Sequence, residues 1–287
     1  MNNQTQRGLD LRSLLVIAGL LLLPGCQLTQ LVKTRNPFAT PPPCVFAPNV
    51  SKEEIIAHLN ANASQLTSWR STKVGIHLKQ RGSIPVDLTA QMAVESPRNF
   101  RLRASSLLGE EADFGSNQEH FWFWIRRSPQ PYVITAAHED METAQRQLPI
   151  PFDPEWVMEA FGVVMIDPNQ YTLERLGDHR VSLMSHEISP SGQAMIKSIG
   201  VDLCTGKIVE HALYDAKGTL IARAKIGNHT TTSDGISIPH RVILEWPQAG
   251  MTMKMGLLDV EVNPAFTPES MWRIPEIAPV IHLGQSQ

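Results

Sequence analysis

Hydrophobic and polar residues alternate along most of the chain after residue 71. A period of two is typical of a β-strand with one buried face. Turns rich in glycine, serine and aspartate separate the alternating runs, so the pattern predicts an antiparallel sheet of about eleven strands. The estimate rests on twelve alternating runs, at about 74–78, 84–94, 100–104, 119–127, 132–137, 171–175, 180–188, 193–204, 207–214, 218–226, 237–246 and 251–262.

Two segments carry a helical pattern instead. Ser51 and Glu54 have the spacing of a capping box, and apolar residues then follow at helical intervals through residue 66. Asp153-Pro154-Glu155 combines a capping residue, proline at the first position and an acid in the first turn. These signals predict one helix before the strands and one inserted between two series of strands.

The first 25 residues have the pattern of a secretory signal peptide, with basic residues followed by an apolar run from Leu14 to Leu23. This run is short for a membrane span. It ends in Leu23-Pro24-Gly25-Cys26, which resembles a lipobox, so Cys26 is expected to carry the lipid at the mature N-terminus. The alternative is an uncleaved N-terminal anchor, which also places the rest of the chain outside the cytoplasm.

Residues 26–50 contain five prolines and no periodic pattern, which favours an extended tether. The alternative is that part of this stretch packs on the domain that follows. We expect residues 51–287 to form that domain as a single unit.

Three cysteines occur in the chain, and Cys26 is assigned to lipid. Cys44 and Cys204 remain as a pair in an oxidising compartment, where they either form a disulfide or stay as two isolated thiols.

Composition narrows the function classes. The net charge of −3 over 287 residues lacks the basic footprint of a nucleic-acid binder. No phosphate-binding glycine loop, no Gly-x-Ser-x-Gly elbow and no metal-ligand spacing occurs, so we expect no cofactor, no metal and no catalytic residue. An envelope hydrolase using His138 and Glu139 is the least favoured alternative.

Three short motifs carry a family resemblance over roughly residues 51–275. They are Pro97-Arg98-Asn99-Phe100-Arg101-Leu102, Glu119-His120-Phe121-Trp122-Phe123-Trp124 and Val262-Asn263-Pro264. Together with the order of elements, they resemble the LolA/LolB superfamily of periplasmic lipoprotein carriers and receptors. The resemblance implies a mainly β, unclosed antiparallel half-barrel whose helices cover the concave face and whose apolar cavity holds acyl chains.

An apolar cavity of this kind is physically reasonable, since burial of apolar area is worth about 25 cal/mol per Å² and an acyl chain would gain several kcal/mol. The alternative for every candidate is ordinary core packing. Arg101 and Arg103 are expected to pair with carboxylates rather than reach a lipid headgroup. The cavity candidates are Leu88, Met92, Phe100, Leu102, Phe121, Phe123, Trp156, Phe161, Met251, Met253 and Met255.

The sequence therefore predicts a lipid-anchored cell-envelope protein that binds lipid or lipoprotein acyl chains. Gln27 after the lipidated cysteine favours the outer membrane, facing the periplasm. The expected partners are the membrane, through the anchor, and a lipid or acylated protein; the pattern does not address the oligomeric state. The alternative is a structural or interaction lipoprotein whose cavity is filled by its own side chains.

Overall fold

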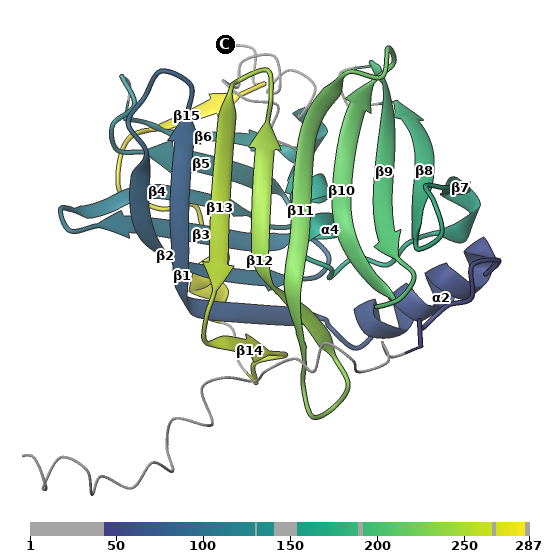
Figure 1. The fold of residues 1–287 in the computed structure, drawn as a ribbon. Helices are drawn as coiled ribbons and strands as arrows, with labels where there is room; N and C mark the ends of the chain where they lie inside the picture. Colours follow the sequence, from purple (N-terminus) through teal and green to yellow (C-terminus); the bar gives the residue numbers. More distant parts are fainter. Residues whose placement is uncertain (1–42, 130, 141–153, 189–191, 266–267, 285–287) are drawn as a thin grey trace, which may run out of the picture. The chain divides into compact units, whose positions relative to one another are not determined.

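The computed structural model describes residues 43–129, 131–140, 154–188, 192–265 and 268–284 (Figure 1). The chain divides into two compact units, 1–43 and 44–287, so the second unit begins before the predicted domain start at residue 51. The predicted signal peptide, the lipobox with Cys26 and most of the predicted tether lie outside the described residues. Within the described part, no helix has the length and apolar character needed to cross a membrane.

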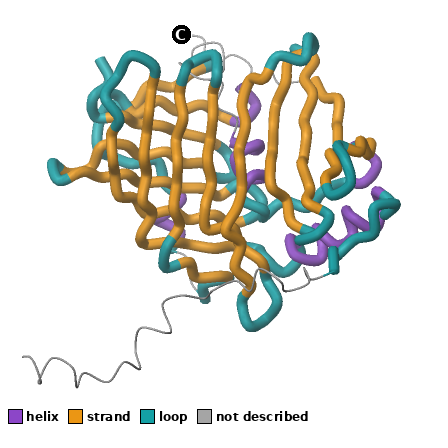
Figure 2. Tube along the Cα trace, viewed as in Figure 1, coloured by secondary structure: helices purple, strands orange, loops and turns teal. Residues whose placement is uncertain are grey.

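Within these described ranges, fifteen strands form one sheet, in two consecutive series (Figures 1 and 2). The first series is β1 (Ser68–Gln80), β2 (Val86–Glu95), β3 (Asn99–Ser106), β4 (Gly109–Ser116), β5 (His120–Ile125) and β6 (Val133–Ala137). The second is β7 (Thr172–Arg175), β8 (Arg180–Ile188), β9 (Ala194–Asp202), β10 (Lys207–Asp215), β11 (Leu220–Thr231), β12 (Ser237–Trp246) and β13 (Met251–Leu257). Two short strands follow, β14 (Val260–Val262) and β15 (Val280–Leu283).

The strand order is β15-β6-β5-β4-β3-β2-β1-β13-β12-β11-β10-β9-β8-β7, with β14 also paired to β1. The two edge strands, β15 and β7, do not pair with each other, so the sheet is unclosed as predicted. Two expectations need correction. The strand number is fifteen rather than about eleven, and the sheet is mixed because β15 runs parallel to β6.

Strand β4 is missing from the prediction, since no alternating run was found between residues 104 and 119. Its acidic residues Glu111 and Asp113 are buried. Arg127 donates to Glu111, and Arg101 on the neighbouring strand donates to Asp113. Buried carboxylates are tolerated when cations pair with them, and this pairing depends on residues outside the local sequence.

Strand β1 belongs to both halves of the sheet. Its register with β2 shifts between Ser71 and Val74, and a bulge of this kind bends a strand. The part before the bulge pairs with β14, and the part after it pairs with β13. Figure 1 shows β1 turning between these two parts, so that β2–β6 cross behind β11–β13.

Two helices lie in the described residues, α2 (Lys52–Ala63) and α4 (Pro154–Ala160), at the two predicted positions. The predicted capping box of α2 is present, with both the Ser51 and the Glu54 side chains bonded to backbone amides. The described part of the chain also contains three short 3-10 turns, η2 (His138–Asp140), η3 (Pro168–Gln170) and η4 (Glu269–Trp272).

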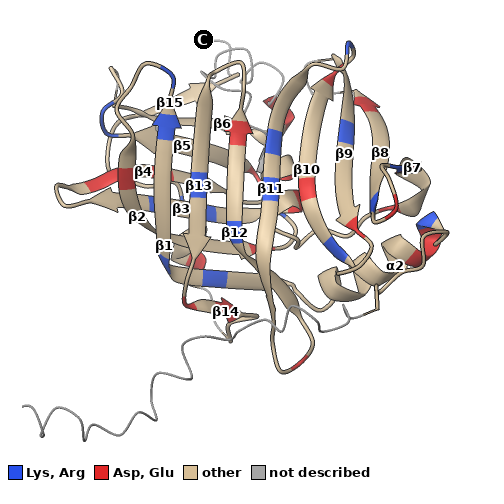
Figure 3. Ribbon diagram, viewed as in Figure 1, with Lys and Arg blue, Asp and Glu red and all other residues tan. Residues whose placement is uncertain are grey.

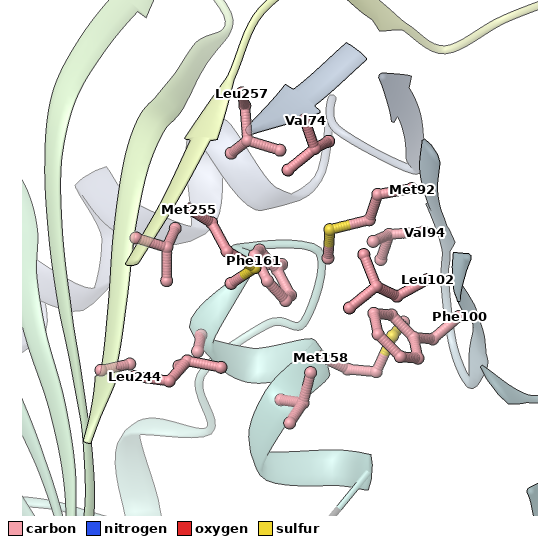
Figure 4. Packing of buried hydrophobic residues seen from close by; sticks show 14 of the residues in the cluster. Val74, Met92, Val94, Phe100, Leu102, Met158, Phe161, Leu244, Met255 and Leu257 are labelled. Atoms are coloured by element: carbon pink, nitrogen blue, oxygen red, sulfur yellow. The ribbon is translucent and has the colours of Figure 1, made fainter. Parts of the chain in front are cut away.

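Helix α4 packs between the inner faces of the two halves. Figure 4 shows Met158 and Phe161 lying between Met92, Leu102 and Phe100 on one side and Leu244 and Met255 on the other. Helix α2 instead packs Ile55, Ile56 and Leu59 against β8 and β9 at one end of the sheet. Two helices of 12 and 7 residues therefore contact only part of the concave side.

The outer face of β4 and β5 is buried as well. Trp122 and Trp124 form a small cluster with Val133, Ile274 and Ala278, so the segment after η4 covers this part of the sheet. The Trp122 ring lies directly over Gly115, where a Cβ atom would stand 2.1 Å from the Trp122 Cζ2 atom. Glycine at 115 is therefore a packing requirement.

Replacing Gly115 with alanine is expected to destabilise the protein by about 1–3 kcal/mol, because the Trp122 ring must shift to admit the new methyl group. The free energy of unfolding in urea measures this loss. Gly75→Ala is the matched control, since a Cβ there meets no heavy atom within 4 Å and should change stability by less than about 0.5 kcal/mol. Equal stabilities for the two variants would contradict the packing requirement.

Candidate functional site

A pocket of about 280 Å³ lies between α2, the segment 162–171 and strands β9–β12. Part of its wall is apolar, as a site for an aliphatic chain requires. The apolar wall comes from α2, from the segment after α4 and from three neighbouring strands. It consists of Leu59, Val164, Ile166, Ile199, Ile208 and Ile226.

Two asparagines of α2 fix the distance between the walls of the pocket. Asn60 donates to the carbonyl of Ile166 and accepts from its amide, at 2.8 Å each. Asn62 makes the same two-point pairing with Ser237, at 3.1 and 2.7 Å. Each asparagine side chain pairs with both the backbone amide and the backbone carbonyl of one residue, as a residue of a neighbouring strand does. These bonds hold α2 to both the segment 162–171 and β12.

An ion-pair cluster fixes α4 beside the pocket. Lys197 on β9 lies 2.9 Å from Glu159 and 3.0 Å from Glu187, and all three side chains are largely buried. Burial alone would lower the pKa of Lys197, but the two carboxylates outweigh it and raise the pKa above its usual value. The lysine therefore stays charged, and it joins α4 to β8 and β9.

The remaining wall is polar. His211 and Ser237 line the pocket, and their exposed fractions are 3% and 6%. Neither His211 Nε2 nor Ser237 Oγ has a hydrogen-bond partner among the described residues. Lys207 and His229 also line the pocket. The site thus places buried polar atoms next to an aliphatic wall.

Burial keeps the imidazoles of this wall neutral. Desolvation, with a smaller contribution from Lys197, lowers the pKa of His211 to about 3. Desolvation, with smaller contributions from Lys207 and His240, lowers the pKa of His229 to about 4. Desolvation also lowers the pKa of Lys207. Near neutral pH, the two histidines therefore act as neutral hydrogen-bonding groups.

The predicted cavity residues lie elsewhere in the concave side, and none of the eleven lines this pocket. Six are buried in the central cluster around α4, with Leu88, Met251 and Met253 packed against it. Phe121 and Phe123 belong to a separate cluster with Ala136 and Leu283. The six residues in the central cluster are Met92, Phe100, Leu102, Trp156, Phe161 and Met255.

A second, more open hollow of about 690 Å³ has Leu88 and Met255 in its wall. The rest of the wall includes His77, Arg241 and Lys254, which are polar or charged. Its shallow form and charged rim suit an aliphatic ligand less well than the smaller pocket does. We therefore take the pocket beside α2 as the candidate site.

Arg101 and Arg103 pair with carboxylates, as expected. Arg101 lies 2.7 Å from Asp113, and Arg103 lies 2.8 Å from Glu110. The Trp122 indole also donates to Asp113, which is 1% exposed. On the second series of strands, positive and negative positions likewise stand side by side (Figure 3), with Lys225 bonded to Glu245.

The structure joins Cys44 and Cys204 by a disulfide. Next to it, the amides of Val45 and Phe46 donate to the carbonyls of Cys204 and Leu203. The last residues of the predicted tether therefore pack on the domain, which is the arrangement that the disulfide requires.

His138 and Glu139 lie together in η2, and neither lines the pocket. His138 Nε2 lies 2.8 Å from the Asn117 carbonyl and 3.3 Å from Ser116 Oγ. A ring nitrogen that donates its proton to a carbonyl cannot also accept a proton from the serine.

Sequence reasoning missed an apolar tip at the β3–β4 hairpin. Leu107 and Leu108 have exposed fractions of 106% and 72%. Arg126 donates to the Leu108 carbonyl at 2.8 Å, which places a guanidinium beside the two leucines. The available signal was a Leu-Leu pair between Ser106 and Gly109, where a hairpin turn would normally carry polar residues.

Acidification is expected to destabilise the fold through His211 and His229. Their pKa values of about 3 and about 4 lie below the ordinary value of 6.5. Between pH 6.5 and these lowered pKa values, the two histidines are protonated in the unfolded chain but not in the folded chain. The free energy of unfolding therefore decreases as pH falls below about 6.5.

The His211→Phe variant tests this expectation. Without the His211 imidazole, the free energy of unfolding should depend less steeply on pH. Between pH 6 and 4 the slope should fall by about 1.4 kcal/mol per pH unit. Urea unfolding over a pH series measures the slope, and the difference at pH 7.5 gives the separate effect of packing. An unchanged slope would contradict a neutral, buried His211.

No model of a known protein family matches the sequence. No curated protein matches it significantly either.

Solved structures resemble this chain at very low identity. A DUF1329 family protein from Desulfovibrio piger is 9% identical, with 79% of this chain and 100% of that chain covered and a TM-score of 0.52. A LolA superfamily protein from Nitrosomonas europaea is 13% identical, with 78% and 98% covered and a TM-score of 0.49. At 9% identity, the likeness to the DUF1329 family protein shows the fold alone, and the unclosed β-rich fold that the sequence predicts is confirmed at that level.

Proposed function

We propose that this chain is a lipid-anchored cell-envelope protein that binds a lipid or a lipoprotein acyl chain in the pocket beside α2. The observation that carries the proposal is the pocket itself, about 280 Å³ on the concave side of an unclosed sheet. An acyl chain placed against its aliphatic wall would leave water, at about 0.8 kcal/mol per buried CH₂ group.

Further features agree with this role. The Cys44–Cys204 disulfide suits an oxidising compartment outside the cytoplasm. Lipid attached to Cys26 would hold the chain at a membrane, and Gln27 favours the outer membrane, facing the periplasm. Transfer of lipoproteins to that membrane is the process in which we propose the protein takes part.

A structural lipoprotein without ligand is the second candidate. The observation that favours it is the central cluster around α4, where the protein's own side chains fill the middle of the concave side. The two candidates differ in one measurable property, which is whether the folded protein retains a lipid.

Native mass spectrometry of the purified protein is expected to detect a bound lipid, and Val164→Trp should abolish it by filling the pocket. Val164 lies in the pocket wall and is partly buried against the central cluster, so circular dichroism verifies that the variant is folded. Val86→Trp, at a strand position with 44% exposure and outside the pocket, is the control and should retain the lipid. Lipid-free wild-type protein would favour the second candidate.

The β3–β4 hairpin is proposed to contact the membrane during exchange of the ligand. Two almost fully exposed leucines beside Arg126 suit insertion among anionic lipids. Exposed leucines gain apolar contact in the bilayer, and the guanidinium gains contact with phosphate groups.

The double variant Leu107→Ser, Leu108→Ser is therefore expected to bind vesicles about tenfold more weakly, measured by co-sedimentation with phosphatidylglycerol and phosphatidylethanolamine. A Cys26→Ser background removes the proposed anchor, so that only the folded surface contributes. Ile188→Ser is the control, since Ile188 is 70% exposed but lies at the end of β8. Equal losses in both variants would contradict a specific role of the hairpin.

A further inference from the structure

Three side chains near the end of the predicted tether carry donor atoms that thiophilic metal ions prefer. They are Cys44, His179 and Cys204, and one ligand atom from each lies within 4.8 Å of the other two. The Cys44 sulfur lies 4.0 Å from His179 Nδ1. No motif spacing indicates this set, because the three residues come from the segment before α2, the β7–β8 turn and the β9–β10 turn.

The two cysteines are joined by a disulfide, so a metal ion can bind their sulfur atoms only after reduction. A dithiol reductant supplies the two electrons and two protons that convert the disulfide to two thiols, and it leaves as its own disulfide. Both cysteines are partly exposed and His179 is exposed, so dissolved reductants and metal ions can reach the group.

Backbone hydrogen bonds hold the donor residues together independently of the disulfide. The Val45 amide donates to the Cys204 carbonyl at 3.1 Å. The Phe46 amide donates to the Leu203 carbonyl at 3.0 Å, and the Leu203 amide donates to the His179 carbonyl at 2.8 Å. These bonds tie the three segments side by side, so we expect the donors to stay together when the disulfide is reduced.

The segment that carries Cys44 has further contacts with the domain. Phe46 packs against the cluster formed by α2, β8 and β9, and its ring centroid lies 5.0 Å from that of His58 on α2. Arg175 donates to the carbonyls of Pro48 and Val50. The segment is therefore fixed by packing and hydrogen bonds along its length, and the position of its thiol does not depend on the sulfur–sulfur bond alone.

We propose that the reduced pair Cys44 and Cys204, together with His179, binds one thiophilic cation, Zn²⁺ or Cu⁺. Two thiolates and an imidazole nitrogen are ligands that both ions accept. For Zn²⁺, three protein ligands leave the fourth tetrahedral position to water. The thiolates form as the cation displaces the two thiol protons to solvent. The metal then makes the link between the segment before α2 and the β9–β10 turn that the disulfide makes in the oxidised chain.

Zinc titration of the oxidised and the reduced protein tests this site, using the full chain with Cys26→Ser so that the pair supplies its only thiols. Dithiothreitol reduces the protein and is removed by anaerobic desalting. We expect the reduced protein to bind one Zn²⁺ at least about a hundredfold more tightly than the oxidised protein, measured by competition with a chromophoric chelator. The same competition with Cu⁺ identifies which of the two ions binds more tightly.

Variants assign the ligands. His179→Leu is expected to weaken Zn²⁺ binding about tenfold or more, because one of three protein ligands is lost. His186→Leu, at an exposed histidine on β8, is the matched control and should leave the affinity unchanged. Replacing both Cys44 and Cys204 with serine should abolish binding. Circular dichroism verifies that the variants and the reduced protein are folded.

Stability gives a second readout, because a metal ion that binds the folded chain raises its free energy of unfolding. Zn²⁺ should therefore raise the urea midpoint of the reduced protein but not that of the double serine variant. Equal zinc affinity before and after reduction, or equal losses in His179→Leu and His186→Leu, would exclude the site. Loss of the native circular dichroism on reduction would also exclude it, because the donor set would not survive. The proposed lipid binding is tested separately and does not depend on these outcomes.

Discussion

Strand β1 is hydrogen-bonded to both halves of the sheet, and its bend between Ser71 and Val74 determines how the two halves meet. Because a strand places alternate side chains on opposite faces, the bend turns one inner face toward the other. Asn263 supports the start of this strand: its side chain accepts from the amides of Thr67 and Ser68 and donates to the Gln65 carbonyl. The Val-Asn-Pro motif thus has a structural role in the fold.

Two inner faces that meet at an angle leave a space that is narrow near the bend and wider toward the free edges. Helix α4 enters this space, and Met158 and Phe161 contact strands of both halves. A helix of seven residues is too short to fill the concave side as far as β8. Helix α2 approaches from that end, and the pocket lies between α2, the segment 162–171 and strands β9–β12.

Much of the fold could be predicted because its determinants are local. Alternation located most strands, and Ser51 with Glu54 located the start of α2. The strand β4 was missed because Asp113 looks solvent-exposed in sequence but is paired with Arg101 across the sheet. Residues such as Phe100 and Met255 were recognised as facing inward, yet sequence periodicity cannot distinguish a side chain that lines a space from one that fills it.

The pocket residues could not be predicted for a related reason. Asn60 and Asn62 look like the polar face of an ordinary helix, and their function depends on Ile166 and Ser237, which lie more than a hundred positions away in the chain. His211 and Lys207 belong to no motif.

The free-energy cost of burying polar groups nevertheless distinguishes the polar wall from ordinary core. An apolar side chain at position 211 would remove the desolvation of a buried imidazole and the acid sensitivity that accompanies it. Ordinary packing therefore gives no reason for histidine at that position. Asn62 already satisfies the backbone of Ser237, so the serine hydroxyl is not needed to hold α2. Buried polar groups that lower the stability of a fold are expected where a protein binds a ligand, and this reasoning supports the proposed binding role of the pocket.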